Sequence, residues 1–129
     1  MPPRRRQATA DDLLGKKARK AEIPISVPTD KGNQVLTMDL VAISSDEYDA
    51  LLAEHPPTPD QKKDGNSYNP DTFAPALISA VLAEPKLTVE QATAIWKSPT
   101  WNRGELRDLF MGCVNLCSEG LNVPFTLAD

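Results

Sequence analysis

Prolines limit how long any helix of this chain can be. Of its 129 residues, twelve are proline, and a proline inside a helix removes a backbone hydrogen bond and clashes with the preceding turn. The prolines at 56–57, 85 and 99 therefore end three segments, and Pro75 requires that its helix begin close before it, at about Asp71. The second half of the chain is predicted to form short helices.

Three capping signatures agree with these limits, because each places a side-chain acceptor three residues before a Glu or Gln. The signatures are Ser44 with Glu47, Thr88 with Gln91, and Asn102 with Glu105. They predict helices that start near 44, 71, 88 and 102, and Gly120 is the expected stop of the last helix. Apolar residues recur on one face of each helix, among them Tyr48, Leu51, Leu52, Phe73, Leu77, Val81, Val89, Ala92, Ile95, Trp96, Leu106, Leu109, Phe110, Cys113, Leu116 and Cys117.

A β-hairpin is predicted before the first of these helices. Ile23, Ile25 and Val27 alternate with other residues, 30–33 has turn chemistry, and 35–43 is rich in β-branched and apolar residues. Pro24 and Pro28 cannot donate ladder hydrogen bonds, so the first strand is expected at an edge or to be short. A lone hairpin is only marginally stable, so one of its faces must pack on the helices.

The first twenty residues form a basic arm that we expect to be disordered. The basic residues of this arm are Arg4, Arg5, Arg6, Lys16, Lys17, Arg19 and Lys20. Asp11 and Asp12 oppose them, which leaves 7 − 2 = +5 in the arm and (14 − 7) − (18 − 2) = −9 in the rest of the chain. Such an arm suits nucleic acid or an acidic patch on a neighbouring subunit, and a solvated arm without a partner is the simpler alternative.

Catalytic and metal-binding chemistry find little support. His55 is the only histidine, and it precedes Pro56 at a helix end, where capping or packing is commoner than general base catalysis. With Cys113 and Cys117 it gives three candidate zinc ligands where structural zinc needs four, so the thiols are expected to be buried hydrophobes. No catalytic residue, metal or cofactor is predicted, and no stretch suits a signal peptide or a membrane span.

Four segments follow one another in an order that resembles a known family. They are Leu-Leu-Ala-Glu-His-Pro-Pro at 51–57, Tyr-Asn-Pro-Asp-Thr-Phe-Ala-Pro-Ala-Leu-Ile at 68–78, Leu-Thr-Val-Glu-Gln-Ala at 87–92 and Gly-Glu-Leu-Arg-Asp-Leu-Phe at 104–110. Their order and spacing resemble the tail assembly chaperones of long-tailed (siphovirus-like) phages that infect actinobacteria. The resemblance covers about the last two thirds of the chain, and the arm and the final residues match no motif of the family.

The resemblance implies a non-enzymatic protein that binds the tape measure protein, keeps it soluble and helps recruit tail tube subunits. It places the protein in the host cell cytoplasm and outside the mature virion. Such a client needs an apolar, adaptable face, for which the candidates are Phe73, Leu77, Val81, Leu106, Phe110 and Val114. The alternative is that these residues form the domain's own core.

The expected fold class is α+β, mainly α, with a disordered basic arm at 1–21. A β-hairpin and short helix follow at 22–57, a linker at 58–69, a compact three-helix unit at 70–120 and an extended tail at 121–129. A structural tail or capsid subunit that tethers neighbours through arm and tail is the second functional hypothesis. A small nucleic-acid-binding protein is the third, although the acidic body opposes it. Association with further copies of the chain remains open.

Overall fold

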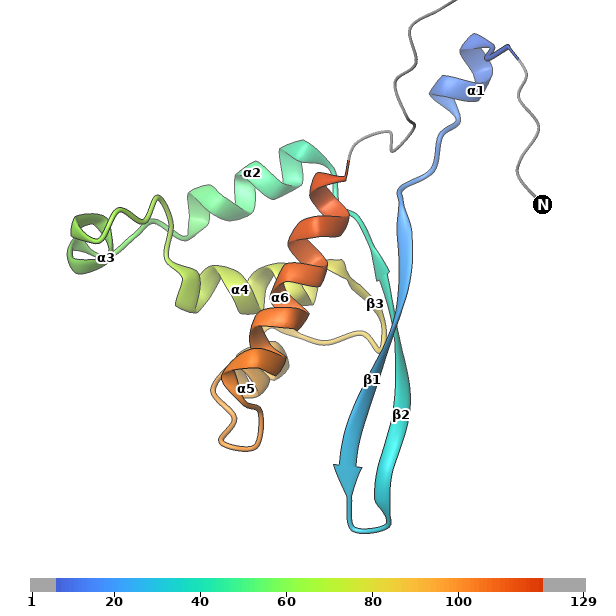
Figure 1. The fold of residues 1–129 in the computed structure, drawn as a ribbon. Coiled ribbons are helices and arrows are strands. Elements are labelled where there is room, and N and C mark those ends of the chain that lie inside the picture. Colours follow the sequence, from blue (N-terminus) through green and yellow to red (C-terminus); the bar gives the residue numbers. More distant parts are fainter. Residues whose placement is uncertain (1–6, 120–129) are drawn as a thin grey trace, which may run out of the picture.

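The computed structural model describes residues 7–119, which form six helices and a three-stranded antiparallel sheet (Figure 1). The elements follow one another as α1 (Ala10–Leu14), β1 (Lys20–Thr29), β2 (Gly32–Val41), α2 (Ser45–Glu54), α3 (Pro59–Lys63), α4 (Pro70–Val81), β3 (Leu82–Glu84), α5 (Val89–Trp96) and α6 (Arg103–Ser118). The fold is therefore a mixed α+β fold, as the sequence predicts. None of the helices in this part of the chain is long and apolar enough to cross a membrane.

The sheet has the order β1-β2-β3, with all neighbours antiparallel. Thr29 pairs with Gly32 at the hairpin turn, and Gly32 has a φ of 98°, a conformation that glycine adopts at no steric cost. The predicted hairpin is confirmed, and its first strand is an edge strand as expected. That strand is ten residues long, however, and it begins at Lys20 rather than at 22.

Both prolines of β1 face the open edge of the sheet. The Ala42 amide donates to the Arg19 carbonyl at 2.8 Å, and inward-bonded pairs alternate with outward-facing ones along an antiparallel ladder. The pairs Pro24–Thr37 and Pro28–Asn33 fall in the outward-facing positions. No ladder bond is lost, and two donors that another strand would need are missing from the edge.

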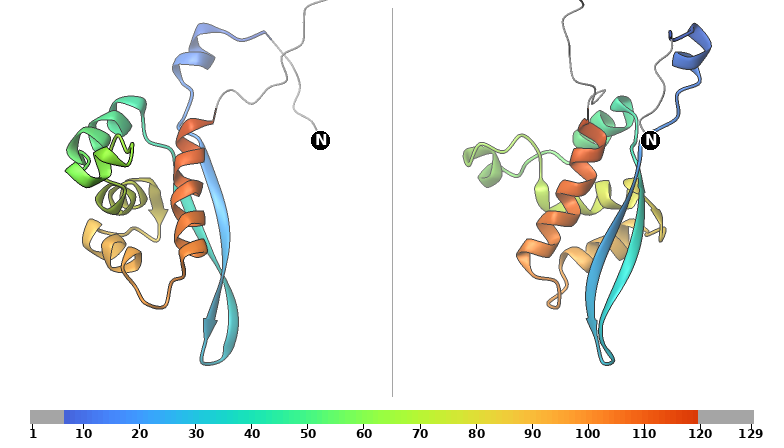
Figure 2. Two further views of the ribbon diagram at one scale, coloured as in Figure 1. Left: turned by 60° about the vertical axis from the view of Figure 1, so that its left-hand side comes forward. Right: turned by 45° about the vertical axis from the view of Figure 1, so that its right-hand side comes forward.

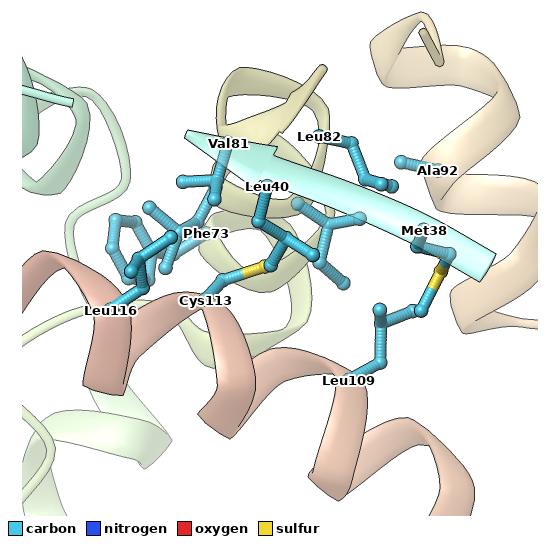
Figure 3. Packing of buried hydrophobic residues seen from close by; sticks show 11 residues of the cluster. Met38, Leu40, Phe73, Val81, Leu82, Ala92, Leu109, Cys113 and Leu116 are labelled. Carbon is cyan, nitrogen blue, oxygen red and sulfur yellow. The ribbon is translucent and has the colours of Figure 1, made fainter. Parts of the chain in front are cut away.

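The helices cover one face of the sheet, as the two views in Figure 2 show. Residues of β1 alternate between exposed and half-buried along its length, and on β2 only Met38 and Leu40 are buried. In Figure 3, Leu40 and Met38 of β2 point toward Cys113 and Leu109 of α6. The core thus lies between the sheet, α4 and α6.

Helix α4 is the centre of the fold, because it contacts α2, α5, α6 and β3. Its cap is Asn69 rather than Asp71, and its first residue is Pro70, so Pro75 lies inside the helix and not in its first turn. The helix ends at Val81. Leu82 pairs with Leu40 as the start of β3, a strand that the sequence did not predict.

Two segments expected to lack structure contain short helices. In the linker at 58–69, Thr58 and Gln61 form a reciprocal capping box that starts α3. Pro59 occupies the first helical position, where its missing N–H costs nothing. In the arm, Thr9 and Asp12 form the same kind of box at the start of α1.

Candidate functional site

Three of the four segments that carry the resemblance meet around one ring. Phe73 is 1% exposed and makes edge-to-face contacts with four other rings, at centroid distances of 5.0 to 6.3 Å. Those rings belong to Tyr48, His55, Tyr68 and Phe110. Edge-to-face geometry adds to the stability that burial alone gives. These aromatic residues therefore hold α2, α4 and α6 together.

Hydrogen bonds join the segment at 51–57 to the one at 68–78. The Asn69 amide donates to the His55 carbonyl at 2.8 Å, and Nδ1 of His55 lies 2.9 Å from Oγ1 of Thr72. Gln61 of α3 donates from Nε2 to Oδ1 of Asn69 at 3.0 Å. His55 is half-buried between a hydroxyl and the Phe73 ring, a position that joins the two helices.

The three candidate binding residues of α4 are part of the core. Phe73 and Val81 are each 1% exposed and Leu77 is fully buried. A partner cannot contact them while the domain is folded. In the folded domain all three are core residues, as the alternative interpretation has it, because α4 is surrounded by helices and the sheet.

The candidate residues of α6 have a different environment. Leu106 and Phe110 are half-buried, and with Trp96 of α5 they line an open hollow of about 530 Å³. The rings of Trp96 and Phe110 meet edge to face at 6.0 Å. Arg103 and Arg107 line the same hollow, so it has an apolar floor and a basic rim. We call it the aromatic hollow.

Val114, the third candidate of α6, is half-buried and packs against the core, and it does not line the aromatic hollow. Trp96 is the residue that the candidate set lacked. Its position at the end of α5, next to the α6 face that carries Leu106 and Phe110, was the available signal. Trp96 also packs against the buried cluster.

A second concave surface lies on the other side of α6, between the first turns of that helix and β1. This groove has a volume of about 420 Å³. Its lining is mainly apolar and includes Ile23, Ile25, Val27, Met38, Trp101 and Leu109, with the carboxylates of Glu105 and Asp108 beside them. We call it the strand groove. No single sequence pattern predicts this groove, although the alternation in β1 continues to Val27, beyond the part of the hairpin that the core covers.

The two concavities lie on opposite sides of α6 and have charges of opposite sign. The residues at 103, 106, 107 and 110 face the aromatic hollow, and those at 105, 108 and 109 face the strand groove. Positions three and four apart lie on one side of a helix, so the sequence sorts arginines to one side and carboxylates to the other. Arg107 and Asp108 meet across the helix surface at 3.5 Å, and both are largely exposed.

The two thiols lie on the core side of α6. Cys113 is fully buried, as expected for a small hydrophobe, while Cys117 is half-buried, and neither forms a disulfide. Burial, with a smaller contribution from the neighbouring Cys117, raises the pKa of the Cys113 thiol to about 12. It is therefore neutral and unreactive near pH 7. Between residues 7 and 119, no cluster of three or more His, Cys, Asp or Glu side chains is placed to hold a metal ion.

The basic residues of the arm differ in their surroundings. Lys16, Lys17 and Lys20 are exposed, whereas Arg19 is half-buried and forms an ion pair with Glu119 at 3.3 Å, where the start of β1 meets the end of α6. Arg4, Arg5 and Arg6, the predicted tail at 121–129 and the predicted stop at Gly120 lie outside the described residues.

Searches with this chain found no matching family model, curated protein or solved structure.

Proposed function

We propose that the protein is a tail assembly chaperone of a long-tailed phage, which binds the tape measure protein, keeps it soluble and helps to recruit tail tube subunits. The identity of the client follows from the family that the ordered motifs resemble. The observation that carries the proposal on the structural side is the aromatic hollow. It is an apolar surface that the domain leaves open, on one of the helices where the sequence predicts binding.

The hollow suits one face of an amphipathic helix. An apolar side chain of the client packs against Trp96 and Phe110, and an acidic residue one turn away meets Arg103 or Arg107. A contact of this size is weak by itself. Weak contacts that repeat along a very long client hold it in solution and still release it when tube subunits polymerise. The protein then acts in the host cell cytoplasm and is left out of the virion.

The direct test is co-expression with the tape measure protein, scored by the soluble fraction of the client and by co-purification. Leu106→Asp places a charge in the aromatic hollow and is expected to lower client solubility at least several-fold. Met111→Asp is the matched control, because Met111 lies on the same helix, is 40% exposed and lines neither concavity. Equal losses with both variants, or with neither, would contradict the assignment of the hollow.

The order of the motifs and the surface are tested separately. A client that remains insoluble and unbound with the unmodified protein contradicts the chaperone function itself. A client that is rescued equally by Leu106→Asp and by the unmodified protein contradicts only the location of the binding face. Circular dichroism of each variant establishes that the helices are retained.

A structural subunit of the tail or capsid is the second candidate. It is favoured by the distal part of the hairpin, which extends past the helices in Figure 1 and carries Val35 at 73% exposure. Protruding hairpins and basic arms can connect neighbouring subunits. Copy number distinguishes the two functions, because a chaperone is missing from purified particles and a structural subunit is present in stoichiometric amount.

A further inference from the structure

The strand groove is an apolar surface that nothing in residues 7–119 fills. The inner face of the hairpin continues beyond the core with Ile25 and Val27 half-buried and with Leu36, the partner of Ile25, 46% exposed. Trp101 and Leu109 form the opposite wall. The edge of β1 is blocked by two prolines, so an added strand is disfavoured. The occupant that fits is a short segment with apolar side chains.

The arm carries such a segment. Leu13 and Leu14 are 71% and 84% exposed, and with Val35 at 73% they are the most exposed large hydrophobic residues described. They lie in α1, whose first turn is held by the capping box between Thr9 and Asp12. Two adjacent leucines on a formed turn of helix leave a water-exposed apolar pair, which gains free energy from any groove that covers it.

The charges of the arm and the groove are complementary. Lys16 and Lys17 follow the leucines directly and are exposed, and Glu105 and Asp108 line the groove. Asp108 also pairs with Arg107 at 3.5 Å, but both side chains are exposed and such a pair is weak. Asp108 can therefore exchange Arg107 for a lysine of the arm. The same asymmetry holds for the whole chain, since the first twenty residues carry +5 and the remainder −9.

The arm of the chain points away from the strand groove of the same molecule. Residues 16 to 19 lie beside Leu116 and Cys117 at the end of α6, and Arg19 is fixed there by its bond to Ala42 and its ion pair with Glu119. The groove lies beside the first turns of α6, and α1 lies beyond the last turn of that helix. Figures 1 and 2 show α1 and the hairpin tip at opposite ends of the molecule.

We propose that the occupant is the arm of a second copy: Leu13 and Leu14 of one molecule enter the strand groove of the next, and Lys16 and Lys17 lie over Glu105 and Asp108. The contact joins two different surfaces, so each copy keeps a free arm and a free groove, and association continues into a ring or an open row. This contact is independent of client binding, because the strand groove and the aromatic hollow lie on opposite sides of α6.

The test is the mass of the full chain by light scattering and sedimentation over roughly 1 to 500 µM, a range that suits a small interface. The mass of the unmodified protein is expected to rise with concentration and to rise less at high salt. A double variant, Leu13→Asp with Leu14→Asp, is expected to weaken association about 100-fold or more. Val35→Asp, on the outer face of the same hairpin, is the control and leaves association unchanged.

Mixing two variants distinguishes this contact between arm and groove from a symmetric contact between identical surfaces. Val27→Glu blocks the groove and the leucine variant blocks the arm, so each alone stays monomeric. Together they form a dimer and nothing larger, since one intact arm meets one intact groove. If Val27→Glu loses its circular dichroism signal, the exposed Asp108→Lys replaces it, with an expected loss of about tenfold or more. A monomeric unmodified protein at every concentration, or a mixture that stays monomeric, overturns the proposal.

Discussion

Helices α4 and α6 both have apolar faces with helical spacing, and the fold uses them in opposite ways. Eight of the twelve residues of α4 are buried, including its serine and its internal proline. Only three of the sixteen residues of α6 are buried. α4 has neighbours on nearly every side, whereas α6 packs through one face and has a concave surface on each flank. A regular apolar face identifies residues that avoid water, and the neighbours of the helix decide whether a partner can reach them.

The largest effect is expected from Phe73→Ala. It removes the ring that four others contact, and large buried aromatic residues cost about 3 to 5 kcal/mol when cut to alanine. Phe110→Ala, in the half-buried hollow of α6, is expected to cost about 1 to 2 kcal/mol. Urea unfolding followed by circular dichroism measures both. Equal costs would show that the two faces are buried alike and would remove the distinction between them.

The next effect is a pH dependence at Cys113. Because the folded thiol has a pKa of about 12 against an ordinary 9.0, the unfolded chain loses this proton first as pH rises. The stability that the neutral buried thiol contributes is complete below pH 9 and is lost as pH approaches 12. Between these values the slope is about 1.4 kcal/mol per pH unit.

Cys113→Ala removes that slope, so its free energy of unfolding is expected to fall less steeply above pH 9 than that of the unmodified protein. Urea titrations at pH 8, 9, 10 and 11 measure the difference. Cys117→Ala is the matched control on the same helix, where the thiol is half-buried. Parallel pH profiles for the unmodified protein and Cys113→Ala would contradict the buried, neutral thiol.

A third change tests how closely α6 approaches the sheet. A Cβ at Gly112 would lie 3.2 Å from Cδ1 of Ile23, so in Gly112→Val the Ile23 side chain or the helix must shift, at an expected cost of about 1 to 3 kcal/mol. A Cβ at Gly104 on the same helix has its closest neighbour at 3.4 Å, an ordinary contact distance, so Gly104→Val should cost less than Gly112→Val. Thermal unfolding ranks the pair, and the reverse order would place the close contact elsewhere.

The smallest effect on stability is expected from Arg107→Glu. Its pair with Asp108 is exposed on both sides, and such pairs contribute below about 0.5 kcal/mol. The rim of the aromatic hollow nevertheless changes sign at this position. Client rescue is therefore expected to fall while the unfolding midpoint stays nearly constant. A variant that unfolds easily would assign Arg107 to the core, and one that rescues normally would remove it from the binding surface.

The sequence alone determined much of the local structure. Reciprocal caps at Thr88 and Asn102 start α5 and α6 as predicted, and the prolines of β1 correctly indicated an edge strand. These features depend on a few adjacent residues, so local chemistry is sufficient to predict them. The two short helices that the sequence did not predict, α1 and α3, also depend on local chemistry, because each starts at a capping box.

Only the tertiary structure decided the remainder. Leu82 leaves the helix because the free edge of β2 supplies its partner, and that edge is distant in sequence. Phe73 and Leu106 each belong to an apolar face with helical spacing. Phe73 nevertheless lies at the centre of an aromatic cluster, whereas Leu106 borders a hollow. Val27 and Trp101 line one groove from positions that no pattern connects. Periodicity gives each element its apolar side, and long-range packing determines which of those sides is left uncovered.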